Sequence, residues 1–170
     1  MKRTLQILSL LFVTCFSSVF FACAQNRVND SFDDRDFLGP ISFGHAGSAF
    51  LLDAYGDGED DVMFLGYSVI EKNTRFDDRQ LRRILLKGLS PEVKCDAVVS
   101  FSSLMPDVAV VFEGRGEEVN VLFDFSHNLL QLNTDGRDIL YDITENRREY
   151  LDVVIQLFPN DGFLRQYASR

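Results

Sequence analysis

The chain has 170 residues, of which 46% are hydrophobic and 25% charged, the composition of one ordinary globular domain. Its 26 acidic residues against 17 Lys and Arg give a formal charge of −9, which argues against a nucleic-acid-binding protein and against electrostatic docking on anionic lipid. Three cysteines are too few for a disulfide scaffold.

The first 24 residues have the pattern of a secretory signal peptide. Lys2 and Arg3 form a positive start, and an uncharged, largely apolar run from Leu5 to Ala22 follows. The exit Ala22-Cys23-Ala24 has the small residues that signal cleavage needs, so we expect residues 1–24 to be a signal helix that is removed. The alternative is a retained membrane anchor, because the run is long enough to span a bilayer.

The same exit resembles a bacterial lipobox over Phe20–Cys23, with the small Ala22 before the cysteine and Phe20 where leucine is usual. That resemblance implies a lipoprotein of the bacterial envelope, with Cys23 as its lipidated first residue and its membrane contact made only through the lipid. Cleavage after Ala24, two residues later, would release a periplasmic protein instead. Either outcome leaves Cys95 as the one unmodified cysteine of the mature chain.

An acidic spacer is expected over residues 25–40, because four aspartates crowd it and Gly39-Pro40 ends it. One folded domain is then expected over residues 41–160, followed by a polar tail over 161–170.

A β-hairpin is predicted at the start of the domain. Residues 48–53 and 62–70 read as strands, and the acidic, glycine-rich segment 55–61 between them is typical of a turn.

Two helices are predicted, each from an apolar stripe at helical spacing. The first covers 75–87, with Thr74 as its cap and a buried face formed by Leu81, Ile84 and Leu85. The second covers 145–158 and is capped by Thr144. Its apolar stripe consists of Leu151, Val154, Ile155 and Phe158.

Between the helices the chain is strand-like and is punctuated by glycine and proline turns. The five predicted strands are 93–101, 107–112, 118–125, 128–132 and 139–143. The unbroken apolar run 108–112 predicts a central strand covered on both sides, whereas alternation over 119–125 predicts one buried face. We therefore expect an α+β fold, an antiparallel sheet of about six or seven strands with two helices packed on one face.

The acidic hairpin is the strongest candidate for a site. Asp53, Asp57 and Asp61 occupy the first, fifth and ninth positions of a loop with Gly58 at the sixth, which is a calcium-loop spacing. On these residues the stretch 43–66 resembles a single FG-GAP repeat, the calcium-binding loop of integrin-like propellers. The resemblance implies a calcium site at the three aspartates, although Tyr55 lacks the oxygen usual at the third position. The alternative is a solvated acidic turn without a cofactor.

No nucleophile elbow, phosphate-binding loop or metalloprotease motif is present, so the sequence predicts a non-enzymatic protein with no catalytic residues. Cys95, His45 and His127 could supply a nucleophile and a base, but their spacing does not indicate a catalytic pair. A secreted hydrolase is the remote alternative.

Export, small size and net acidity favour a protein that binds a basic protein partner, for example as an inhibitor or immunity-type protein. The predicted partner-facing residues are Asp57, Asp60 and Asp61. A calcium-binding module built on the hairpin 53–61 is the alternative function.

Overall fold

The computed structural model describes residues 35–56, 62–90, 94–95, 104–134 and 137–169. The predicted signal peptide, Cys23 and residues 25–34 of the predicted spacer lie outside the described residues, as does segment 57–61 of the acidic hairpin. In the part of the chain that is described, no helix is both long enough and apolar enough to cross a membrane.

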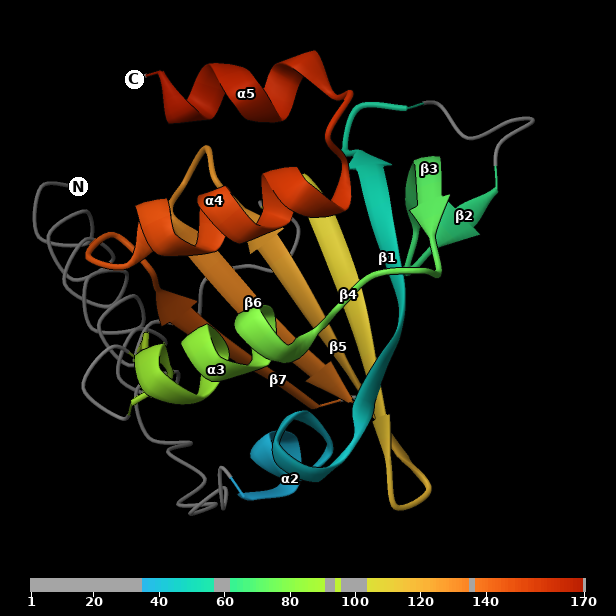
Figure 1. Ribbon diagram of the computed structural model, residues 1–170, viewed down its shortest axis with the longest axis vertical. Coiled ribbons are helices and arrows are strands. Elements are labelled where there is room, and N and C mark those ends of the chain that lie inside the picture. Colours follow the sequence, from blue (N-terminus) through green and yellow to red (C-terminus); the bar gives the residue numbers. More distant parts are fainter. Residues whose placement is uncertain (1–34, 57–61, 91–93, 96–103, 135–136, 170) are drawn as a thin grey trace, which may run out of the picture. The chain divides into compact units, whose positions relative to one another are not determined.

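The described chain combines four helices with a seven-stranded antiparallel sheet, which confirms the predicted α+β class (Figure 1). The helices are α2 (Arg35–Phe43), α3 (Arg79–Gly88), α4 (Arg147–Leu157) and α5 (Gly162–Ala168). The strands are β1 (His45–Asp53), β2 (Met63–Phe64), β3 (Tyr67–Asn73), β4 (Val108–Gly114), β5 (Glu117–Asp124), β6 (Leu129–Thr134) and β7 (Arg137–Asp142). The strand order is β2-β3-β1-β4-β5-β6-β7, so the strands after β4 follow one another as simple hairpins.

Two apolar clusters cover the two faces of the sheet. The larger one joins alternate residues of β4 to β7 with buried side chains of all four helices. The smaller one contains Phe50, Ala109, Leu122 and Leu140 on the opposite face. Strand β4 is buried on both sides as predicted, but β5 is too, because the second cluster covers the face that alternation left for solvent.

Helix α2 begins inside the segment that we expected to be an acidic spacer ending at residue 40. Its residues Phe37 and Ile41 are four apart, so they share one helix face, and both are fully buried in the larger cluster. The folded unit therefore includes residues before 41, and the acidic composition of the predicted spacer hides the core residue Phe37 within it.

Helix α3 begins at Arg79 and its N-cap is Asp78, so the prediction that Thr74 caps a helix from 75 is wrong. The predicted buried face of Leu81, Ile84 and Leu85 is confirmed. The later start has a local cause, since the Asn73 side chain accepts a hydrogen bond from the backbone N–H of Arg75 and so competes with helix formation.

Helix α4 likewise begins at Arg147 with Asn146 as its N-cap, and not with Thr144 as predicted. The backbone N–H of Thr144 donates to Asp142 Oδ1 at 2.8 Å, which holds this residue in a turn before the helix. The predicted stripe is buried at Leu151, Val154 and Phe158.

The predicted strand 62–70 is two strands joined by a tight turn. Leu65 and Gly66 have φ values of 49° and 87°, the left-handed pair that a two-residue hairpin turn requires. The longer strand, β3, pairs antiparallel with β1, as the predicted hairpin requires. Of the predicted strand 93–101 only Lys94 and Cys95 are described, and Lys94 forms an isolated bridge with Tyr141.

Candidate functional site

A cavity of about 330 Å³ opens where the end of β1 meets α5. We call it the β1–α5 pocket. It is lined by Leu51–Tyr55, Ile70, Met105–Asp107, Ser126, Asp161, Phe163, Leu164 and Tyr167. Most of the lining is apolar, and a few polar groups converge on it, which is the usual make-up of a small binding site.

A β-bulge places Ile70 at the rim of this pocket. Leu51 pairs with Glu71 and Leu52 pairs with Val69, so Ile70 is the extra residue of β3 and has no partner in β1. A bulge re-aims the side chain that it carries. Ile70 lines the pocket and leaves 62% of its surface exposed.

The C-terminal segment, predicted as a polar tail, forms the opposite wall as helix α5. Asp161 caps this helix, since its Oδ1 accepts a hydrogen bond from the backbone N–H of Leu164 at 2.7 Å. Leu164 and Tyr167 are buried, whereas Phe163 stays 56% exposed at the rim. Because Leu164 and Tyr167 are three residues apart, helical spacing was the sequence signal that could have revealed this wall.

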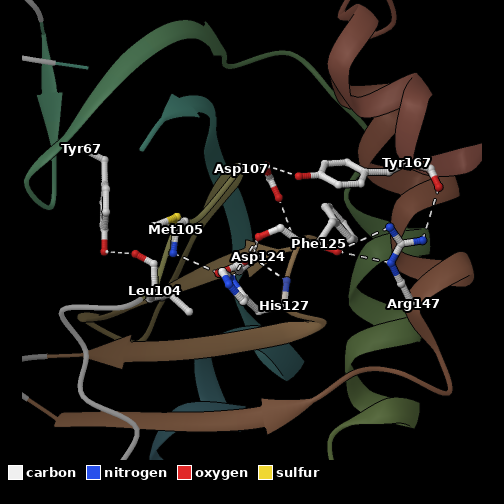
Figure 2. Close-up of polar contacts among 10 residues, drawn as sticks. Tyr67, Leu104, Met105, Asp107, Asp124, Phe125, His127, Arg147 and Tyr167 are labelled. Carbon is white, nitrogen blue, oxygen red and sulfur yellow. Dashed lines mark hydrogen bonds and ion pairs between the residues drawn. The ribbon is translucent and has the colours of Figure 1, made fainter. Parts of the chain in front are cut away.

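Asp107 lies at the inner end of the pocket, between the ends of β1 and β5. Its carboxylate Oδ2 accepts a hydrogen bond from the backbone N–H of Phe125 at 2.8 Å, and its Oδ1 accepts one from Tyr167 Oη at 3.3 Å (Figure 2). Its backbone also bonds to both neighbours, donating to Phe123 O and accepting from the N–H of Leu52. The carboxylate is thus fixed in place.

The pKa of Asp107 is raised to about 6, chiefly through desolvation by burial and also through the charge of nearby Asp124. The hydrogen bonds from Phe125 and Tyr167, and the charge of Arg147, oppose that rise. The pKa of Tyr167 is raised to about 12, chiefly by burial and then by the charge of Asp107. A strongly raised carboxyl pKa in a cavity is typical of functional sites.

Asp124 organises the neighbouring β5–β6 turn and is fully buried. Oδ1 accepts hydrogen bonds from Ser126 Oγ and from the backbone N–H of His127, while Oδ2 contacts His127 Nδ1 at 2.8 Å and accepts one from the N–H of Met105 at 2.9 Å (Figure 2). This arrangement was not predicted from the sequence, where its signal is an aspartate three residues before a turn histidine. A carboxylate that orients a histidine ring also occurs in general-base catalysis, but here the same oxygens hold the turn and the pocket residue Met105.

The predicted site residues fall partly outside the described part of the chain. Asp57, Asp60 and Asp61 lie outside the described residues, so the calcium-binding and partner-binding predictions for them stay predictions. Asp53 is described: it lines the β1–α5 pocket, and its Oδ1 accepts a hydrogen bond from the backbone N–H of Tyr55 at 2.9 Å. Across the described ranges, no cluster of three or more His, Cys, Asp or Glu side chains could hold a metal ion.

The residues of the remote hydrolase hypothesis lie on different elements. His45 is exposed at the start of β1, and His127 lies in the β5–β6 turn against Asp124. Cys95 donates its backbone N–H to Leu140 O and packs, half-buried, against the smaller apolar cluster. This packing is what a thiol with a structural role shows.

Comparison with protein-family models, with curated proteins and with solved structures finds no match to this chain.

The calcium hypothesis makes a direct prediction about thermal stability. If Asp53, Asp57 and Asp61 bind the ion, calcium should raise the melting temperature of the protein by several degrees relative to EDTA, because a ligand that binds only the folded state stabilises it. The measurement is thermal unfolding followed by circular dichroism. The increase should vanish in Asp57→Ala, and an equal melting temperature in calcium and EDTA would reduce the hairpin to a solvated turn.

Proposed function

We propose that this chain is a non-enzymatic, exported protein of the bacterial envelope, released or anchored through Cys23, that binds a basic protein partner through the β1–α5 pocket. In its most specific form the partner is an enzyme that the chain blocks, as an inhibitor or immunity-type protein does. The observation that carries the proposal is an apolar pocket with an exposed apolar rim and an acidic lining.

The rim supports a macromolecular partner. Tyr55, Ile70 and Phe163 are exposed by 81%, 62% and 56%, and all three line the same pocket. Isolated apolar side chains on a surface are ordinary, but several around one cavity mark an interaction site. Large apolar and aromatic side chains next to a pocket are also the usual source of binding energy at protein interfaces.

The charge of the pocket supports a basic partner. Three carboxylates line it, those of Asp53, Asp107 and Asp161, and among the described lining residues there is no Lys, Arg or His. The chain as a whole carries a formal charge of −9. Complementary charge speeds the encounter with a partner and rejects partners of the wrong sign.

Selection of ligands from a random peptide library displayed on phage tests the proposal with the intact protein as bait. We expect the enriched peptides to combine an aromatic or aliphatic residue with a neighbouring Lys or Arg. Their affinity should fall about tenfold or more with Ile70→Asp, because that change places a charge where an apolar contact is made.

Phe163→Ala and Phe43→Ala form a matched pair for the same experiment. Both side chains are exposed, but Phe43 belongs to α2 and does not line the pocket. Peptide affinity should fall with Phe163→Ala and stay unchanged with Phe43→Ala. Peptides that bind both variants and Ile70→Asp as well as they bind the wild-type protein would overturn the proposal.

A further inference from the structure

We propose that the β1–α5 pocket receives a lysine or arginine side chain of the partner, with its aliphatic stem against the apolar walls and its cation beside the Asp107 carboxylate. This inference rests on the proposed function and specifies which chemical group the pocket recognises.

The carboxylate of Asp107 is held in place by hydrogen bonds that, among the described residues, come from neutral donors. Both of its oxygens accept hydrogen bonds from neutral donors, the Phe125 N–H and the Tyr167 hydroxyl. Within the described part of the chain no Lys, Arg or His forms an ion pair with it. A partly buried carboxylate held only by neutral donors is a favourable partner for an incoming cation.

The charged groups around Asp107 do not cancel its attraction for an incoming cation. Asp53 on β1 and Asp161 before α5 line the same pocket, and Asp124 on β5 adds to the negative field at Asp107. Arg147 on α4 opposes that field, but it contributes only through space.

The guanidinium of Arg147 is already engaged by two backbone carbonyls, and Arg147 does not line the pocket. Its Nε and Nη2 donate to Phe125 O, and its Nη1 donates to Tyr167 O. It also lies over the Tyr167 ring, 5.4 Å from the centroid. Figure 2 shows this cation beside Phe125 and below Tyr167, with its hydrogen bonds directed to these two residues.

The walls suit a long side chain with an apolar stem. Leu51, Leu52, Ile70 and Leu164 contribute aliphatic surface, and the volume of about 330 Å³ accommodates a single side chain. Lysine and arginine bury their methylene stems against such surface while their charged ends stay with polar groups. A purely apolar side chain would cover Asp107 without pairing its charge, and an acidic one would be repelled, so the pocket discriminates against both.

The charge of Asp107 is a cost to the fold. Burial raises the pKa of this carboxyl to about 6, so at neutral pH the ionised form is held against its desolvation. A neutral amide at the same position could still accept the Phe125 N–H. The fold therefore does not need the negative charge, whereas recognition of a cation does.

Side-chain analogues test the inference independently of any peptide. The probe is n-butylammonium, compared with n-butanol and butyrate as neutral and anionic molecules of the same length. Binding is followed at neutral pH by NMR of the Met105 and Ile70 methyl groups, which line the pocket. We expect saturable shifts with n-butylammonium, about tenfold weaker binding of n-butanol, and none of butyrate.

Two aspartate variants make the test specific. Asp107→Asn should weaken n-butylammonium binding about tenfold, whereas Asp152→Asn, on the exposed face of α4, should leave it unchanged. Equal binding of n-butanol and n-butylammonium, or an unchanged affinity in Asp107→Asn, would overturn the inference.

The two proposals can fail separately. If the peptides selected above bind equally well after their Lys or Arg is replaced by norleucine or citrulline, the pocket does not receive a cation. This inference then falls, while binding of a protein partner through the apolar rim of the pocket stands. If n-butylammonium binds through Asp107 but no pocket-dependent peptide is found, the proposal of a protein partner is contradicted. The pocket is then a site for a free organic amine.

Discussion

Replacing Asp124 with Ala should lower the free energy of unfolding by about 4 kcal/mol, the largest loss that we expect from a single polar substitution in this chain. Asp124 is fully buried, and its two oxygens serve donors from Met105, Ser126 and His127. Alanine would leave the backbone N–H groups of Met105 and His127 without their carboxylate acceptor, which is itself fully buried. Each such group costs about 1–3 kcal/mol.

The loss should also reach the pocket. Met105 joins the Asp124 carboxylate to the segment that carries Asp107, because the Met105 N–H donates to Asp124 Oδ2 at 2.9 Å. Without that bond, the lining residues Met105–Asp107 lose one of their attachments to β5. We therefore expect Asp124→Ala to weaken binding at the pocket even at temperatures where the protein is still folded.

Urea unfolding followed by circular dichroism measures the loss of unfolding free energy. In thermal unfolding, the melting temperature of Asp124→Ala should be lower than that of the wild-type protein by roughly 10 °C. Asp142→Ala is the matched control, since Asp142, at the end of β7, also accepts a backbone N–H from the following turn, that of Thr144, but is exposed. Its loss should stay below about 1 kcal/mol. A loss for Asp124→Ala as small as that of the control would show that the buried carboxylate does not hold the turn.

The stability of Asp107→Asn relative to the wild-type protein should rise with pH. The pKa of Asp107 is raised from 3.8 to about 6 in the folded state, chiefly by burial. Between these values the folded protein holds a proton that the unfolded chain has released, so the free energy of unfolding falls as the pH rises through that range. Asparagine removes this dependence.

We expect the difference between Asp107→Asn and wild type to shift by about 2 kcal/mol in favour of the variant between roughly pH 4 and pH 7. This is less than the roughly 3 kcal/mol that the full change in pKa would give, because water screens a carboxyl that is only partly buried. Urea unfolding at a series of pH values, with both proteins measured side by side, isolates this group from the other carboxylates.

Asp142→Asn provides a control of opposite sign. Hydrogen bonds from the hydroxyl and the N–H of Thr144 lower the pKa of Asp142. The wild-type protein should therefore become more stable relative to this variant as the pH rises. Equal pH dependence of Asp107→Asn and wild type would mean that the Asp107 carboxyl is not desolvated. Together with the binding test, a variant that is more stable at neutral pH but binds cations less well would show stability given up for function.

Local patterns in the sequence were enough for most of the sheet and for the cores of two helices. The run Val108–Phe112 predicted a strand covered on both faces, and β4 is buried on both. Leu81, Ile84 and Leu85 predicted the buried face of α3. These features depend on neighbours within a few residues, because side-chain direction follows the period of the local backbone.

The ends of these helices depended on single hydrogen bonds that composition does not show. Thr74 and Thr144 are both good caps by type, yet Asp78 and Asn146 occupy the cap positions. Before α3, the side chain of Asn73 accepts a hydrogen bond from the backbone N–H of Arg75 and donates one to Leu157 O on α4. A contact between residues so far apart cannot be inferred from propensity.

The pocket was decided by the tertiary structure. Asp107 and Tyr167 are separated by sixty residues, and the sequence placed the second in a polar tail. Their contact exists because α5 folds back over the end of the sheet, where Leu164 and Tyr167 bury apolar surface against the larger core cluster. The bulge that brings Ile70 to the same pocket depends in turn on the register between β1 and β3.

By itself, then, the sequence determined the fold class, the acidic character and most of the described strands, because these follow from composition and short-range periodicity. Which carboxylate is held by neutral donors within the described part of the chain, and which apolar side chains surround it, followed only from the packing of α5 and β3 against the end of β1. Burial and charge pairing are properties of neighbours in space, and in this protein those neighbours come from opposite ends of the domain.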